Sequence, residues 1–233
     1  MMKFIEQPES YSDMLVRVFT CSLITGVICT VALAMGLPWL KQLIESIPGQ
    51  SEIGPIKGLN VAYVLVPFIV SLVSRVIKLH DRISDIFRIR LKFDTEHILL
   101  NLARGAGIGI DQKIRQVLRE KRQEAMYRIF YPYAGFKDPR IDMQLVRSAL
   151  DNWGWFWAEL ESSTILLIAI AIAWLIKDEL VIKACVIWLI ILIALMVYHW
   201  FECRRSAIRE VNAILIDNER KKEIQTYLQS ISS

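Results

Sequence analysis

Residues 184–201 read ACVIWLIILIALMVYHWF and contain no charged side chain. Three other runs are also uncharged, at residues 19–40, 58–74 and 162–176. A helix needs about 20 mostly apolar residues to cross the hydrocarbon core of a bilayer, so each run is a candidate membrane span. A soluble helical core is the alternative, but four such runs are hard to bury in a chain of 233 residues.

Two of the runs are short and must borrow neighbouring residues. The run at 58–74 extends into residues 76–79 if the side chains of Arg75 and Lys78 reach towards water. The run at 162–176 extends back into DNWGWFWAELE, residues 151–161. Aromatic side chains gather at membrane–water boundaries, because the ring is apolar while the indole N–H reaches water. The sequence therefore predicts a membrane-interface belt that consists of Trp153, Trp155, Phe156 and Trp157.

Basic residues predict the orientation of the spans, because cytoplasmic flanks are enriched in Lys and Arg. Residues 1–17, 75–161 and 202–233 hold 24 of the 28 Lys and Arg residues, whereas 41–57 and 177–183 hold 2 each. Both termini and the long middle segment are therefore predicted to lie in the cytoplasm. No cleavable signal peptide is evident, so the first span is predicted to be retained. The loop at 41–57 is predicted to turn at Pro48, Gly49, Gly54 and Pro55.

The cytoplasmic insert has the pattern of several helices. Residues 75–93 have apolar positions at helical spacing, which predicts that the second span continues as an amphipathic helix. Residues 111–130 predict one helix with Asp111 as its N-cap. Asp142 can cap another helix that runs into the third span. The glycine-rich stretch RGAGIGI, which begins at Arg104, predicts a turn before the helix at residues 111–130.

The C-terminal tail after residue 202 also has apolar residues at helical intervals. It predicts an amphipathic helix that continues from the fourth span. Such a helix could pack against the insert, form an oligomer seam or rest on lipid. Its mixed charge and short heptad run favour packing against the insert.

Charged side chains near the spans supply two candidate sites. Glu159 and Glu161 lie at the predicted cytoplasmic mouth of the third span, where an oligomer could arrange them as a ring that attracts cations. Glu159 is the better candidate for a pore mouth, and a solvated helix end is the simpler alternative. A basic cluster in the insert could bind anionic lipid headgroups, which we rank first, or an anionic ligand such as a nucleotide. The cluster comprises Arg82, Arg88, Arg90 and Lys92.

No motif in the chain indicates catalysis, a cofactor or a metal. The glycines of RGAGIGI do not follow the dinucleotide-binding pattern. Arg75 and His80 have a spacing found in some ribonucleases, but basic residues are expected at a membrane exit and no partner set accompanies them. The three histidines are scattered, without metal-ligand spacing. The four cysteines lie in or beside the spans and are predicted to be reduced, at Cys21, Cys29, Cys185 and Cys203.

The two hairpins of spans around a cytoplasmic insert, with FDTEHILL soon after the second span, resemble a known family. It is the four-transmembrane effector family found beside nucleotide second-messenger synthases in bacterial antiphage defence. Phe93 and Asp94 match the FD-containing stretch of that family. The resemblance implies a protein that perturbs or perforates the inner membrane when signalled. HILLNLARGAG stands where the family has an L-P-W-N-like sequence, so no ligand residues are transferred.

Together these features predict an all-α polytopic membrane protein with four transmembrane helices in two hairpins and a helical cytoplasmic insert. The predicted segments are a transmembrane hairpin at 1–79, the insert at 80–152, a second hairpin at 153–201 and a tail helix at 202–233. The predicted function is a homo-oligomeric, pore-like effector of the bacterial inner membrane, whose insert senses a nucleotide or a soluble cytoplasmic partner. A membrane anchor or scaffold is the rival. No enzyme activity, cofactor or nucleic-acid partner is expected.

Overall fold

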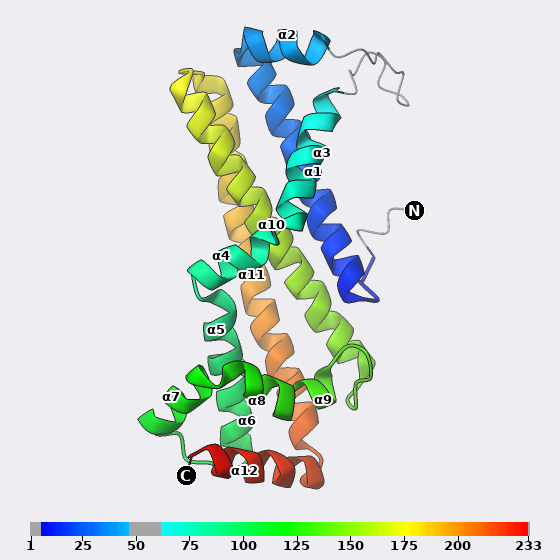
Figure 1. Ribbon diagram of the computed structural model, residues 1–233, viewed down its shortest axis with the longest axis vertical. Coiled ribbons are helices and arrows are strands. Elements are labelled where there is room, and N and C mark those ends of the chain that lie inside the picture. The colour runs from blue at the N-terminus through cyan, green and yellow to red at the C-terminus, as the bar shows by residue number, and fades with distance from the viewer. Residues whose placement is uncertain (1–5, 47–61, 233) are drawn as a thin grey trace. The chain divides into compact units, whose positions relative to one another are not determined.

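The computed structural model describes residues 6–46 and 62–232, and all regular structure in these ranges is helical (Figure 1). The all-α prediction is therefore confirmed for the described residues. The longest helices are α1 (Tyr11–Gly36), α10 (Met143–Leu175) and α11 (Glu179–Leu215). The remaining elements are α2 (Pro38–Ser46), α3 (Ala62–Val76), α4 (Leu79–Ile86), α5 (Ile89–Phe93), the π-helix η1 (Asp94–Leu99), α6 (Leu100–Gly105), α7 (Gln112–Glu120), α8 (Arg122–Ile129), α9 (Tyr131–Ala134) and α12 (Asn218–Ser232).

The chain divides into two compact units. The first, which we call the polar unit, comprises Met1–Met14, Asp81–Trp153 and His199–Ser233. The second, the apolar unit, comprises Leu15–His80 and Gly154–Tyr198. Because α10 and α11 each run without a break across a unit boundary, each contributes residues to both units.

Three helices, α1, α10 and α11, are long and apolar enough to cross a membrane. The second predicted span is different, because α3 and α4 meet this condition only as a pair, with a 57° bend between them. The described chain therefore has three candidate spans, or four if the bent pair counts as one. The predicted continuous helix after the second span is wrong. The chain turns at Ile77 and Lys78, where Lys78 has a φ of 51°.

The core of the apolar unit consists of small and branched side chains from α1, α10 and α11. Cys29 and Leu33 from α1 meet Leu166 and Ala173 from α10, and Cys185 from α11 completes the contact. The α1–α3 approach is also close, since a Cβ placed on Gly26 would lie 3.0 Å from the Cβ of Pro67. Small residues permit such close packing between membrane helices.

The first span differs from its prediction at both ends. It begins early, because Ser10 and Asp13 form a reciprocal cap in which the Asp13 N–H donates to the Ser10 hydroxyl at 3.1 Å. It ends at Gly36 rather than Leu40, because Pro38 disfavours a helical conformation in the preceding residue. Residues 41–46 belong to α2, so the predicted loop is wrong there. Its predicted turn residues Pro48, Gly49, Gly54 and Pro55 lie outside the described residues.

Local signals in the insert are confirmed in three places. The Ile114 N–H donates to Asp111 Oδ1 at 2.7 Å, and the Gln144 N–H donates to Asp142 Oδ1 at 2.9 Å. After α6 the chain turns at Gly107, whose φ is 81°. One prediction is wrong, because residues 111–130 form two helices, α7 and α8, that are separated at Lys121.

The tail packs against the insert, as predicted. α12 contacts α6, α7 and α8, and Figure 1 shows it in red beside α6. Its apolar side chains Ile224 and Leu228 are buried. The tail is not one continuous helix, however, because α11 ends at Leu215 and a turn capped by Asp217 precedes α12.

Candidate functional site

A buried carboxylate is the main polar feature of the apolar unit. Glu161, in α10, is 3% exposed. The hydroxyl groups of Ser22 and Ser74 donate hydrogen bonds to its Oε2 at 3.1 and 3.0 Å. Ser22 belongs to α1 and Ser74 to α3, so one carboxylate oxygen connects three helices. We call Ser22, Ser74, His80 and Glu161 the Glu161 cluster.

The second carboxylate oxygen binds the first turn of α4. The backbone N–H of His80 donates to Glu161 Oε1 at 3.2 Å, and the ring Nδ1 of His80 lies 3.2 Å from the same oxygen. His80 is 4% exposed. The first N–H groups of a helix have no acceptor within the helix. Glu161 accepts one of these N–H groups in α4, beyond the bend between α3 and α4.

The hydrogen bonds explain how this buried carboxyl group is tolerated. A buried carboxylate is costly unless donors replace its water shell. Glu161 has two hydroxyl donors, one backbone donor and a histidine ring against its two oxygens. Ionisable residues inside membrane proteins are rare and commonly mark functional sites. Glu161 was a candidate from the sequence, but its partners Ser22, Ser74 and His80 could not be predicted, because no local pattern links them.

A second charged group lies in the same unit. Arg17, in α1, is 1% exposed, and its guanidinium carbon lies 4.6 Å from the ring centroid of Trp155. Glu159, in α10, is 5% exposed. The alternative of a solvated helix end is therefore wrong for both Glu159 and Glu161, because each side chain is enclosed by the unit. The role of Glu159 at a pore mouth stays a prediction.

The four residues of the predicted interface belt are in different surroundings. Phe156 and Trp157 are buried, and the Trp157 ring lies 5.9 Å from that of His80. Trp155 is half-buried beside Arg17. Trp153 belongs to the polar unit. The belt stays a prediction, and this burial shows that the rings also serve internal packing.

Exposed tryptophans occur elsewhere in the apolar unit. Trp39 is 60% exposed and Trp174 is 70% exposed. Each lies near the end of an uncharged run, which is the usual position of interfacial aromatic residues. Neither tryptophan was among the predicted interface residues, although their positions at the ends of the runs could have indicated them.

In the polar unit, an aromatic cluster surrounds Phe93, which is 1% exposed. Its ring lies 4.6 Å from Trp153, 5.3 Å from Trp200 and 5.2 Å from His97 between centroids. These edge-to-face contacts connect α5 and η1 with α10 and α11 inside one unit. One-turn π-helices are frequent at functional sites, and η1 begins immediately after Phe93.

Asp94 follows Phe93 and is also buried. The Arg122 guanidinium donates to Asp94 Oδ2 at 2.8 Å. Burial raises the pKa of Asp94 to about 6, although the charges of Arg122 and Arg90 oppose that rise. The FD pair that carries the sequence resemblance is therefore part of the packed interior.

The predicted basic cluster is mostly at the surface. Arg82, Arg88 and Lys92 are exposed. Arg90 is half-buried and pairs with Asp81 at 3.1 Å. Three of the four predicted residues are thus at the solvent-exposed surface.

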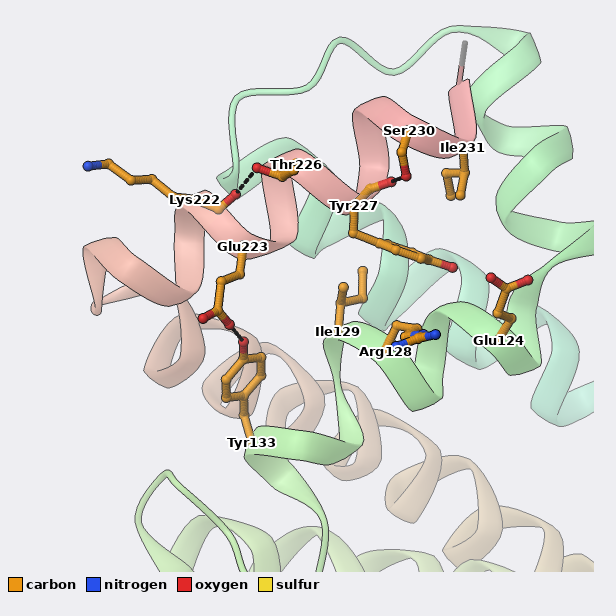
Figure 2. A pocket seen from close by; sticks show the side chains of 10 residues that line it. All are labelled: Glu124, Arg128, Ile129, Tyr133, Lys222, Glu223, Thr226, Tyr227, Ser230 and Ile231. Atoms are coloured by element: carbon orange, nitrogen blue, oxygen red, sulfur yellow. Dashed lines mark hydrogen bonds between the residues drawn. The ribbon is translucent and has the colours of Figure 1, made fainter.

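A pocket of about 630 Å³ lies between α8, α9 and α12 (Figure 2). The Tyr133 hydroxyl donates to Glu223, and Figure 2 shows the Tyr227 hydroxyl directed towards Glu124. Burial, together with the hydrogen bond to Glu223, raises the pKa of Tyr133 to about 12. Arg128 and Lys222 offset the two acids, so charge alone does not select a ligand. In residues 6–46 and 62–232, no set of three or more His, Cys, Asp or Glu side chains is arranged to hold a metal ion.

Comparison with known proteins identifies the family. The model of the YmfE protein family matches residues 10–229, so the chain belongs to that family. No curated protein and no solved structure matches the chain. The family match does not bear on the resemblance to antiphage effectors, which stays a prediction.

Proposed function

We propose that this member of the YmfE protein family is a homo-oligomeric effector of the bacterial inner membrane. In this proposal the polar unit receives a signal in the cytoplasm, and the apolar unit responds by opening a path for ions. The Glu161 cluster carries the proposal, because one buried carboxylate binds groups from α1, α3 and α4. Loss of that carboxyl group would act on all of these helices together.

The cluster supports a closed arrangement held by Glu161. Both carboxylate oxygens are engaged by donors from helices other than α10. If the carboxylate is lost, the donors are left buried without their acceptor, which commonly costs about 1–3 kcal/mol per group. Separation of the helices then lowers the free energy. In the proposal, Glu161 therefore holds these helices in the closed arrangement.

The signal is proposed to be a nucleotide second messenger or a soluble cytoplasmic partner, in line with the resemblance to antiphage effectors. The distribution of Lys and Arg supports an orientation with both termini in the cytoplasm. The rival proposal is a membrane anchor that recruits a soluble partner through the insert. The exposed basic side chains of the insert suit either role.

Ion flux from liposomes tests the proposal. Wild-type protein and the Glu161→Gln variant are reconstituted with an entrapped ion-sensitive dye, and Glu179→Gln serves as the matched control. Glu179 is a surface glutamate in the apolar unit, with 81% of its side chain exposed. We expect Glu161→Gln to raise basal leakage severalfold, and Glu179→Gln to leave it unchanged. Candidate nucleotides are expected to raise leakage by the wild type.

Folding must be controlled in the same samples. Circular dichroism and thermal unfolding in detergent show whether Glu161→Gln remains folded. The milder Ser22→Ala and Ser74→Ala variants, which each remove one donor, are expected to raise leakage by smaller amounts. Folded variants that leak no more than an inert membrane protein would refute the proposed role of Glu161 in the closed arrangement. Wild-type protein that shows no increase in leakage with any nucleotide would favour the membrane-scaffold proposal.

A further inference from the structure

The turn between α4 and α5 exposes two large apolar side chains. Ile86 is 74% exposed and Phe87 is 66% exposed. Nearby apolar residues of the same unit, such as Phe93 and Leu99, are buried. Adjacent, highly exposed apolar side chains are a feature of surfaces that meet a membrane or a partner. We call Arg82, Ile86, Phe87, Arg88 and Lys92 the α4–α5 tip.

Hydrogen bonds hold this turn in a defined conformation. The Phe87 N–H donates to the Ile83 carbonyl at 3.0 Å, and the Arg90 N–H donates to the Ser84 hydroxyl at 3.2 Å. Ser84 itself is 1% exposed. Arg88 adopts the left-handed conformation, with a φ of 54°. A residue without glycine's freedom stays there only where its surroundings enforce it, so the apolar pair is presented by an ordered turn.

Basic side chains flank the apolar pair. Arg82 lies one helical turn before Ile86 in α4, so these two side chains share a helix face. Arg88 is the N-cap of α5, and Lys92 lies within α5. Arg82, Arg88 and Lys92 are exposed. The exposed Asp85 offsets one of these charges, and the net charge of the tip remains positive.

The position of the tip in the chain indicates what it meets. α3 ends at Val76, and α3 together with α4 meets the condition for a membrane span. Even fully extended, the chain from Val76 to Ile86 spans at most about 35 Å. A bilayer that holds α3 is therefore always within reach of the tip. Apolar side chains on an exposed turn do not enclose a small anion, whereas a bilayer surface can receive them.

We propose that the α4–α5 tip docks on the anionic surface of the membrane that the chain spans. Ile86 and Phe87 enter the boundary between headgroups and acyl chains, as the apolar face of an interfacial helix does. Arg82, Arg88 and Lys92 bind the phosphates of anionic lipids, whose surface potential attracts basic segments near a span. This docking is independent of ion flux and suits an effector or a scaffold.

Photocrosslinking to lipid tests the docking on the full chain. Benzoylphenylalanine replaces Phe87, an aromatic exchange at an exposed position, and the protein is reconstituted in bilayers of phosphatidylcholine and phosphatidylglycerol. The control carries the same group at Tyr127, which is 63% exposed in the polar unit. Mass spectrometry then identifies the lipid adducts at each position.

We expect lipid adducts at position 87, with phosphatidylglycerol enriched severalfold over its share of the bilayer, and little lipid adduct at position 127. Combining the label at 87 with Arg82→Gln, Arg88→Gln and Lys92→Gln should reduce the enrichment to the bulk composition. The absence of lipid adducts at 87, or adducts to a second copy of the chain instead, would overturn the docking. Lipid adducts without enrichment would overturn the role of the basic residues.

Discussion

At the scale of single residues, surroundings separate acids that look alike in the sequence. Glu159 and Glu161 lie two positions apart on α10, and both are buried. Glu161 connects several helices, because serines far away in the sequence donate hydrogen bonds to it. Glu179, on α11, is instead largely exposed in a surface pair with Lys183. The contacts of each carboxylate, rather than its residue type, determine what its loss would do.

Asp94 is expected to make stability depend on pH. Its pKa is raised from the ordinary 3.8 to about 6, so the folded state binds the proton more tightly than the unfolded state. The stabilisation is complete below about pH 4 and is lost as pH rises through 6. By linkage, the unfolding free energy falls by about 2–3 kcal/mol across this window.

The Asp94→Asn variant isolates this effect, because Asn does not titrate. Thermal unfolding in detergent between pH 4 and pH 7 should show the wild type losing stability, relative to the variant, as pH rises. A constant difference over that range would contradict the assignment. A difference that grows in favour of the wild type would mean that the Arg122 ion pair outweighs burial.

At the scale of elements, Lys177 forms the turn between α10 and α11. Its φ of 58° is left-handed, which is unfavourable for any residue with a side chain. Asp178 follows and accepts the Val181 N–H at 3.1 Å, so it caps α11. Lys177→Gly is expected to raise the unfolding free energy by about 1 kcal/mol, as relief of strain exceeds the added entropy of the unfolded chain.

Lys183→Gly provides the comparison for this change. Lys183 lies inside α11, where glycine should destabilise by about 1 kcal/mol. Thermal melts of both variants in one detergent decide the sign. Two destabilised variants would show that the turn does not strain Lys177.

The packing of α12 gives a second prediction at this scale. Ile224 is 0% exposed and Leu228 is 2% exposed. Replacing either by alanine should destabilise the polar unit by about 2–5 kcal/mol, because a cavity remains. Ile216→Ala is the matched control, since Ile216 is 82% exposed and surface changes usually stay within about 0.5 kcal/mol. Denaturant unfolding measures all three, and equal effects would exclude docking of the tail.

At the scale of the whole molecule, the distribution of charge predicts orientation. Cysteines introduced at Tyr127 and Ile216, both exposed in the polar unit, should be shielded from an impermeant maleimide in intact spheroplasts. A cysteine at exposed Leu43, in the predicted outer loop at residues 41–57, should be labelled. Disrupting the membrane should make all three reactive. Labelling of Tyr127→Cys in intact spheroplasts would reverse the orientation.

Much of the fold could be predicted because its signals are local. Long uncharged runs indicated the membrane class, and Asp111 and Asp142 indicated helix starts through hydrogen bonds to residues two or three positions away. The break at Lys121 and the bend after α3 were missed, since apolar spacing continues through both. Periodicity reports which face of a helix is apolar and not where the helix breaks.

The sequence by itself determined that this is a helical chain with spans long enough for a bilayer, because length and hydrophobicity act on each segment separately. Only the tertiary structure decided that Glu161 binds Ser22, Ser74 and His80, and that the tryptophan-rich stretch includes a buried Trp157. These outcomes depend on contacts between helices distant in the chain. The residues adjacent to Glu161 in the sequence do not indicate which distant groups will donate hydrogen bonds to it in place of water.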